Sequence, residues 1–105
     1  MCGRYVITSP VEALRELFDF VGPPPNLAPR WNAAPTQVMP VVRRREDGAR
    51  ELALLRWGLV PSWAKDPSVG AKMINARGET VAEKPAYRDA FRKRRCLVPA
   101  DGFYE

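Results

Sequence analysis

Hydrophobic and polar positions alternate along the chain in short blocks, and this pattern predicts a mixture of strands and helices. Residues 3–7, with the sequence GRYVI, are β-branched and aromatic and are typical of a strand. Residues 36–44 and 51–60 are two further strand-like runs, and the segment between them contains Asp47 and Gly48. Because an Asp-Gly pair between apolar runs favours a tight turn, we expect a β-hairpin there.

The first helix is expected to begin at Ser9 and to end before Gly22. Ser9, Pro10 and Glu12 have the residue types and spacing of a capping box with proline in the first helical position. Apolar residues then recur at helical spacing. These residues are Val11, Leu14, Leu17, Phe18 and Val21. Gly22 is followed by three prolines, which cannot continue a helix.

The remainder of the chain is less regular. Residues 22–35 hold five prolines, so we expect an ordered extended segment without regular structure, packed on the core. Residues 61–80 show no period, and so long an irregular segment in a small domain is usually functional. Residues 85–94 predict a second helix that buries four residues, Ala86, Tyr87, Ala90 and Phe91. Residues 96–105 predict a kinked strand.

These elements together predict an α+β fold with mostly antiparallel strands and two helices. The strand-like pattern continues as far as Glu105, the last residue. A sheet that stopped there would have an uncovered edge, which natural proteins usually avoid. We therefore expect the chain to be the front part of a longer domain.

Composition narrows the class of protein. The chain has 105 residues, of which 46% are hydrophobic, enough for one folded domain. No apolar run reaches the length of a membrane span, and the N-terminus lacks the layout of a signal peptide. The net charge of +5 favours a polyanionic partner, with nucleic acid ahead of an anionic membrane surface. Two cysteines without a CxxC motif, and no histidine, argue against a zinc site or a disulfide framework and for a reducing compartment.

Cys2 is the residue with the most distinctive chemistry, because it directly follows the initiator methionine. If Met1 is removed, Cys2 carries a free α-amine and a thiol on adjacent carbons. Such amines and thiols ordinarily have pKa values of about 8 and about 8.5, so both are partly available near neutral pH. This 1,2-aminothiol is suited to capturing an aldehyde, first as a Schiff base and then as a thiazolidine ring. The alternative is that Cys2 is simply part of the first strand.

Four stretches occur in an order and spacing that favour the first interpretation. They are MCGRY, WNAAPTQ, WGLVPSWAKD with INARGET after it, and CLVPADGFYE. Together they resemble the SRAP (SOS response-associated peptidase) family of abasic-site processing proteins, over residues 2–105. The resemblance implies that residues 1–105 are the N-terminal portion of a single SRAP domain, truncated within a barrel-like sheet with two peripheral helices.

The resemblance also implies an activity. Members of this family lose Met1, by aminopeptidase or autopeptidase cleavage, and bind single-stranded DNA. The N-terminal cysteine then forms a thiazolidine DNA–protein crosslink with the ring-opened abasic sugar, a lyase-like reaction that shields the lesion. We expect a monomer that uses no cofactor, no metal and no membrane. It would act beside the nucleoid in a bacterial cytoplasm or in a eukaryotic nucleus.

Two further residues are implied to be catalytic. Asn75 in the INAR stretch matches the residue that holds the N-terminal amine and the sugar, since an amide orients an amine without adding charge. Its alternative role is to close an Asx turn. Glu105 matches the general acid/base for ring opening and Schiff-base formation. Its alternative role is that of an unstructured terminal acid.

Four more residues are implied to contact DNA. Arg4 and Arg77 match positions that bind the phosphate backbone, where guanidinium groups form bidentate hydrogen bonds. Trp63 matches an aromatic residue that packs on nucleotides beside the lesion. Its alternative role is that of a core tryptophan. Pro35 is expected to shape the floor of the pocket.

Other conspicuous residues are expected to be structural. We expect Trp31 and Trp57 in the core, and Cys96 as a small buried hydrophobe. The arginines at 43–45 are expected at the solvated tip of the hairpin. The basic run at 92–95 is expected to offset the dipole of the second helix.

One feature departs from the family pattern. The family carries a further catalytic histidine beyond this point, and this chain has no histidine. Two other functions stay open. One is a single-strand DNA-binding module without a covalent step. The other is an N-terminal-cysteine amidotransferase, in which the thiol attacks an amide.

Overall fold

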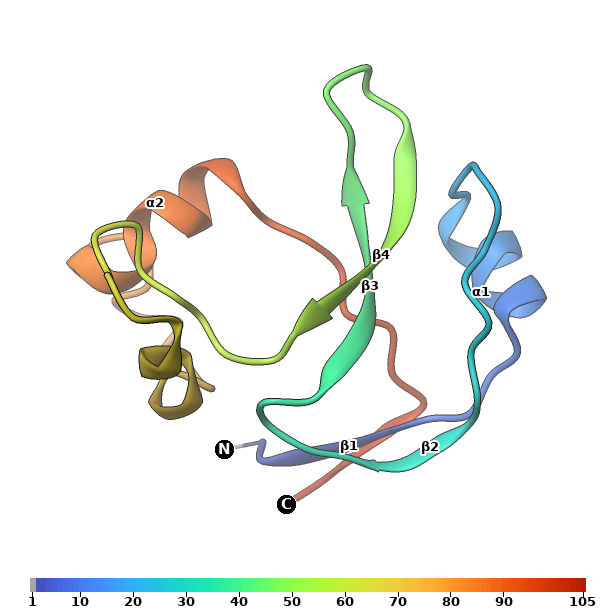
Figure 1. Ribbon diagram of the computed structural model, residues 1–105, viewed down its shortest axis with the longest axis horizontal. Helices are drawn as coiled ribbons and strands as arrows, with labels where there is room; N and C mark the ends of the chain where they lie inside the picture. Colours follow the sequence, from blue (N-terminus) through green and yellow to red (C-terminus); the bar gives the residue numbers. More distant parts are fainter. Residues whose placement is uncertain (1) are drawn as a thin grey trace.

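The computed structural model describes residues 2–105, and Met1 lies outside the described residues. The elements follow the order β1 (Arg4–Ile7), α1 (Val11–Phe18), β2 (Arg30–Ala33), β3 (Val38–Arg44), β4 (Arg50–Arg56), the 3₁₀ helix η1 (Pro67–Lys72), α2 (Pro85–Lys93) and β5 (Gly102–Tyr104). Figure 1 shows the β3–β4 hairpin standing over β1 and β2, with α1 and α2 on opposite sides of the hairpin. The predicted α+β class with antiparallel strands is confirmed.

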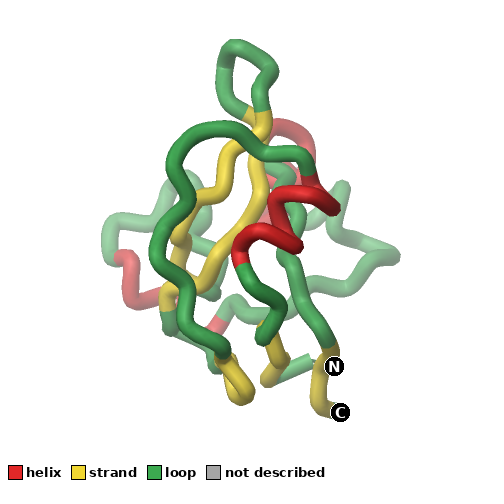
Figure 2. Tube along the Cα trace, turned by 90° about the vertical axis from the view of Figure 1, so that its right-hand side faces the viewer, coloured by secondary structure: helices red, strands yellow, loops and turns green. Residues whose placement is uncertain are grey.

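The first sheet joins the two ends of the described chain. Its strand order is β2-β1-β5, and both pairs are antiparallel. Tyr5 lies opposite Ala33 of β2 and opposite Phe103 of β5. The beginning of the chain and its last strand therefore lie side by side, although strands are short and loops make up much of the trace (Figure 2).

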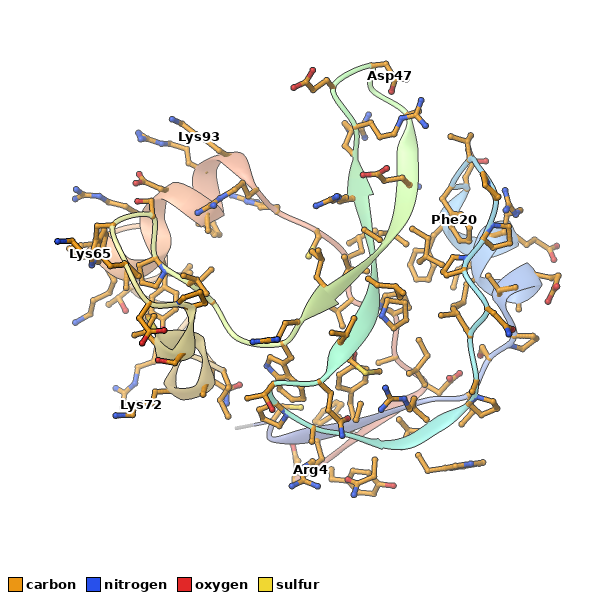
Figure 3. All side chains as sticks on the ribbon, in the orientation of Figure 1. Arg4, Phe20, Asp47, Lys65, Lys72 and Lys93 are labelled. Carbon is orange, nitrogen blue, oxygen red and sulfur yellow. The ribbon has the colours of Figure 1, made fainter. Side chains whose placement is uncertain are left out.

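The predicted hairpin is present as β3 and β4, paired from Val38↔Arg56 to Arg44↔Arg50. Gly48 has a φ of 87°, a left-handed conformation that glycine adopts without strain. Asp47 closes the turn by accepting a hydrogen bond from the Ala49 amide at 2.9 Å and by pairing with the Arg45 guanidinium. Figure 3 places Asp47 at the far tip, as expected for a solvated end.

A single hydrophobic core fills the space between α1, the hairpin and the first sheet. Its buried members are Tyr5, Ile7, Leu14, Phe20, Ala33, Met39 and Val42. Trp57 packs against them, as predicted, with its ring centroid 5.5 Å from that of Tyr5. Each fully buried aliphatic or aromatic side chain contributes about 1.5–3 kcal/mol, so this core is the main source of stability.

The start of α1 differs from the prediction. The N-cap residue is Pro10, and no side chain caps the helix. The Ser9 hydroxyl instead donates a hydrogen bond to Asp101 at 2.6 Å, so it is not available for the predicted capping box. The helix also ends earlier than expected, at Phe18, because Asp19 takes a left-handed φ of 54°.

The loop after α1 contains more regular structure than its prolines predicted. Val21, expected in the helix, forms a parallel bridge with Glu51 of β4. Strand β2 begins directly after Pro29, inside the segment expected to lack regular structure. Trp31 in this strand is 68% exposed, so its predicted place in the core is wrong. The physical reason is that β2 lies at the edge of the sheet and buries only Ala33.

The second helix is present and lies on the surface. α2 spans Pro85–Lys93, close to the predicted 85–94. Its apolar residues, Ala86, Tyr87, Ala90 and Phe91, are half-buried, and none is fully buried. Cys96, predicted to be buried, is exposed because it follows the end of α2 before the chain returns to β3 at the Val42–Leu97 bridge.

Candidate active site at the amino-terminal cysteine

Cys2 lies directly before β1, at the edge of an apolar cavity of about 950 Å³. The residue is half-buried, and its Sγ atom lies 3.5 Å from the carbonyl oxygen of Arg4. Tyr5, Trp57 and Asn75 line the cavity beside it. The thiol is therefore both sheltered on one side and open to a ligand.

Asn75 is the side chain that reaches Cys2 across the site. Its Nδ2 atom donates a hydrogen bond to the carbonyl oxygen of Cys2 at 2.9 Å, in a partly buried position. The family resemblance implies that Asn75 holds the N-terminal amine of Cys2. In this structure the Asn75 side chain instead binds the carbonyl oxygen of Cys2. Its side chain thus bridges the site rather than closing a local Asx turn.

Three contacts fix the backbone that presents Asn75. The Tyr87 hydroxyl donates to the carbonyl oxygen of Asn75 at 3.0 Å, and the Trp57 indole donates to that of Ile74 at 3.1 Å. The Leu59 amide donates to the carbonyl oxygen of Met73 at 3.0 Å. The chain around Asn75 is therefore anchored by α2 and by the segment that follows β4, although no regular element contains it.

Two glycines allow these segments to approach closely. Gly58 has a φ of 142°, and a Cβ atom built there would lie 2.4 Å from the carbonyl oxygen of Gly70. Real Cβ atoms do not approach an oxygen this closely, so a side chain at this position requires the backbone to move. Gly58 and Gly70 thus set the distance between the end of β4 and η1, from which the chain continues to Asn75.

Glu105 follows β5 and is exposed. β5 runs antiparallel to β1, with Tyr104 opposite Arg4, so the residue after Tyr104 comes to the end of β1 that carries Cys2. Within the described residues, Glu105 is not among those that line the cavity. The topology therefore brings Glu105 to the correct end of the site without closing a contact there.

Arg4 and Arg77 are both exposed near the reactive residues. The Arg4 side chain donates to Oδ1 of Asn32 at 3.1 Å, which ties it to β2, and Figure 3 shows it at the edge of the molecule below β1. Arg77 follows Asn75 by two positions. The two arginines thus belong to the two segments, one with Cys2 and one with Asn75, that meet at the site.

Among residues 2–105, Trp63 and Pro35 are not part of the wall of the cavity. Trp63 is 58% exposed in the loop after β4, so it is not a core residue. Pro35 is half-buried in the turn before β3 and, among residues 2–105, is not one of those lining the cavity. The adjacent Thr36 has a φ of 72°, which marks this turn as conformationally constrained.

Two titratable groups that line the cavity have raised pKa values. Burial raises the pKa of the Tyr5 phenol, with Arg30 acting in the opposite direction and Cys2 adding to the increase. Although Cys96 as a whole residue is exposed, partial desolvation of its thiol, which lines the same cavity, raises the pKa of that thiol, against a smaller lowering by Arg43. The thiolate is the nucleophilic form of cysteine, and a raised pKa lowers the thiolate fraction at neutral pH. Cys96 is therefore a poorer nucleophile than an ordinary cysteine.

Sequence reasoning missed two features of this site. Tyr87 was expected only as a buried helix residue, but its hydroxyl holds Asn75. Asp101 was expected only as part of the kinked strand at residues 96–105, but it binds Thr8 and Ser9 between β1 and α1. Both roles depend on hydrogen bonds between residues that are far apart in the sequence, and no local sequence pattern indicates such bonds.

Residues 2–105 contain neither a metal-binding cluster of side chains nor a membrane-spanning helix. No three histidine, cysteine, aspartate or glutamate side chains there lie close enough to share a metal ion. No helix in that part of the chain has the length and apolar character needed to cross a membrane.

Comparison with known proteins gives one family. A family model described as SOS response associated peptidase (SRAP) matches residues 1–105. The chain is 44% identical over 109 residues to abasic site processing protein YoaM of Bacillus subtilis (strain 168), which covers 100% of this chain and 47% of that protein. It is 38% identical over 88 residues to abasic site processing protein HMCES of Xenopus tropicalis, covering 73% of this chain and 26% of that protein.

A solved structure has the same fold. The crystal structure of a protein from Bordetella bronchiseptica superposes with a TM-score of 0.75 at 29% identity, covering 99% of this chain and 50% of that one. The chain thus spans about half the length of the relatives and of the solved structure that it matches end to end.

Proposed function

This chain belongs to the SRAP family, and on that premise we propose that it processes abasic sites in single-stranded DNA by forming a covalent bond through Cys2. The relatives named above are abasic site processing proteins, and their matches cover 100% and 73% of this chain. The single observation that carries the proposal is the hydrogen bond between Asn75 and the carbonyl of Cys2 at 2.9 Å.

The proposed chemistry requires both nucleophiles of an N-terminal cysteine. Removal of Met1, by an aminopeptidase or by self-cleavage, frees the α-amine; Met1 itself lies outside the described residues. The amine nitrogen adds to the aldehyde carbon of the opened abasic sugar and water leaves, which gives an imine. The sulfur then adds to the imine carbon, and its proton passes to the nitrogen to complete the thiazolidine.

The neighbouring residues have defined parts in this scheme. Asn75 holds the cysteine backbone so that the amine and thiol are presented toward the cavity. Glu105 serves as general acid/base, moving the proton from the sugar hydroxyl during ring opening and the protons exchanged during imine formation. Such a group contributes about 10²- to 10⁴-fold when it is well positioned.

Binding of the strand is assigned to the exposed cations and an aromatic side chain. Arg4 and Arg77 bind phosphates on either side of the lesion, where charge-assisted hydrogen bonds are strong. Trp63 stacks on a neighbouring base, a contact of about 1–3 kcal/mol. The protein would act as a monomer, beside the nucleoid in a bacterium or in the nucleus of a eukaryote.

The experiment uses the chain that begins at Cys2 and a single-stranded oligonucleotide with one abasic site. We expect an adduct that survives denaturing electrophoresis. Cys2→Ala should abolish it, and Cys96→Ala should leave it, because the Cys96 thiol has a raised pKa and no adjacent α-amine. Equal, fully salt-reversible binding to intact and abasic strands, without an adduct, would instead indicate a non-covalent DNA-binding module. Turnover of glutamine would indicate an amidotransferase.

A further inference from the structure

Asp101 makes an unusually complete set of hydrogen bonds at the junction between β1 and α1. Its Oδ2 atom accepts from the backbone amides of Thr8 at 2.6 Å and of Ser9 at 3.0 Å. Its Oδ1 atom accepts from the Ser9 hydroxyl at 2.6 Å, and its own amide donates to the carbonyl oxygen of Val6 at 2.7 Å. One side chain therefore binds a segment more than 90 positions away in the sequence.

These bonds lie immediately before β5, a short strand whose large side chains are mostly exposed. β5 contains only Gly102–Tyr104, and its two large side chains, Phe103 and Tyr104, are 63% and 50% exposed. Register is normally set by burying one face of a strand, and a strand with exposed side chains is weakly specified. Asp101 supplies a further restraint, because its contacts with Thr8 and Ser9 fix the residue before β5 against the residues that follow β1.

The register decides which way Glu105 faces. Phe103 lines the cavity that contains Cys2, whereas Tyr104 pairs with Arg4 and donates its hydroxyl to the Trp31 carbonyl at 2.9 Å. Side chains alternate along an extended chain, so the residue two positions after Phe103 is on the Phe103 side. A slip of one residue would move Glu105 to the side of the Arg4 side chain and away from the cavity that Phe103 and Cys2 both line.

We infer that Asp101 is a positioning residue: it locks β5 on β1 and so holds Glu105 on the side of the sheet that faces Cys2. The expected effect on reaction rate rests on the proposed function. The expected effect on the register of β5 does not depend on any activity. A residue that only stabilises the fold would lower the amount of active protein without acting through Glu105.

The experiment is a double-mutant cycle on the rate of adduct formation, with Asp101→Ala, Glu105→Ala and the double variant. We expect Asp101→Ala to slow the reaction by about tenfold or more, a part of the factor expected for a general acid/base. Asp101→Ala added to Glu105→Ala should slow the reaction by less than about twofold further, because no carboxylate is left at position 105 for Asp101 to position. Effects of the two changes that multiply, or an unchanged rate in Asp101→Ala, would overturn the inference.

Two variants serve as matched comparisons. Asp101→Asn keeps a side-chain oxygen for the Thr8 and Ser9 amides, so it should restore most of the rate lost in Asp101→Ala. Asp47→Ala removes a carboxylate that likewise accepts a hydrogen bond from a backbone amide, but at the far tip of the hairpin. This variant should leave the rate unchanged. An Asp101→Asn rate as low as that of Asp101→Ala would count against the hydrogen-bonding role.

A register measurement by NMR separates this inference from the proposed function. In the wild-type chain, cross-strand contacts between Tyr5 and Phe103 should be present. They should be lost in Asp101→Ala while the signals of the core persist; if that variant does not fold, Ser9→Ala should weaken them instead. If the wild-type chain forms no adduct, the proposed function fails, and these contacts alone decide whether Asp101 fixes β5. Contacts that persist in Asp101→Ala and in Ser9→Ala would overturn the inference.

Discussion

Asn75 and Cys2 lie 73 positions apart in the sequence, and the side-chain amide of one donates a 2.9 Å hydrogen bond to the carbonyl oxygen of the other. Neither residue belongs to a helix or strand. The bond exists because Tyr87 from α2 and Trp57 from the end of β4 fix the backbone on the Asn75 side, while β1 fixes the cysteine side. The fold therefore acts as a frame for two irregular segments that meet at one cavity.

Asn75→Ala should slow adduct formation without abolishing it. Removing a neutral hydrogen bond of about 0.5–1.5 kcal/mol corresponds to a rate lower by about twofold to tenfold. The rate is measured with an abasic single-stranded oligonucleotide under denaturing electrophoresis. Asn26→Ala, which removes an exposed amide elsewhere, is the control and should have the wild-type rate. Identical rates for the two variants would remove Asn75 from the site.

Arg4→Ala and Arg77→Ala should each weaken binding to single-stranded DNA and reduce its dependence on salt. Each lost phosphate contact lowers the slope of log K against log salt by about 0.7 for a single strand. Arg43→Ala is the matched control, because Arg43 already pairs with Glu51 at 2.8 Å and lies in the hairpin. Binding is measured by fluorescence anisotropy across a salt series. A larger change of slope in Arg43→Ala than in Arg77→Ala would contradict the assignment.

The Asp101 carboxylate should make stability depend on pH in the acid range. Hydrogen bonds from the Ser9 hydroxyl and from the Thr8 and Ser9 amides lower the pKa of Asp101 in the folded chain. Its contribution is therefore complete above the unfolded pKa of about 3.9 and is lost as the pH falls through the lower folded value. Asp101→Asn should be less stable than wild type at neutral pH, and the difference should shrink below about pH 4. Urea unfolding at a series of pH values measures the difference in the free energy of unfolding between the two chains. A difference that stays constant across this pH range would contradict the prediction.

Leu14 and Leu17 provide a matched test of the core. Both lie on α1, but Leu14 is 5% exposed and Leu17 is 74% exposed. Leu14→Ala should lower the free energy of unfolding by about 2–5 kcal/mol, because it leaves a cavity in the core. Leu17→Ala should change it by no more than about 0.5 kcal/mol, as is usual at the surface. Denaturant melts compare the two, and equal losses would show that α1 is oriented differently.

Much of the fold was predictable because its signals are local. The Asp47-Gly48 turn between two apolar runs predicted the β3–β4 hairpin, and the proline at the first position of α2 marked its start. The family match confirms the resemblance drawn from four sequence stretches. The first helix was misjudged at both ends, because the Ser9 hydroxyl binds Asp101 and Asp19 takes a left-handed conformation.

The candidate site was predictable as a set of residues but not as a geometry. The motif order brought Cys2 and Asn75 into one hypothesis, yet no spacing indicates that the amide reaches the carbonyl of the cysteine. Trp31 was misplaced in the core for a related reason. Apolar character alone does not tell whether β2 is a central or an edge strand, and here it is an edge. Such facts depend on pairing between distant segments.

The central claim is that the amine and the thiol of an N-terminal cysteine act together on the abasic aldehyde. The most direct test compares the chain that begins at Cys2 with one in which Met1 is retained, using the mass of the intact adduct on abasic single-stranded DNA. The account predicts an adduct that has lost one water, formed only by the chain with a free Cys2 amine. An equal yield of adduct from the chain that keeps Met1 would contradict it.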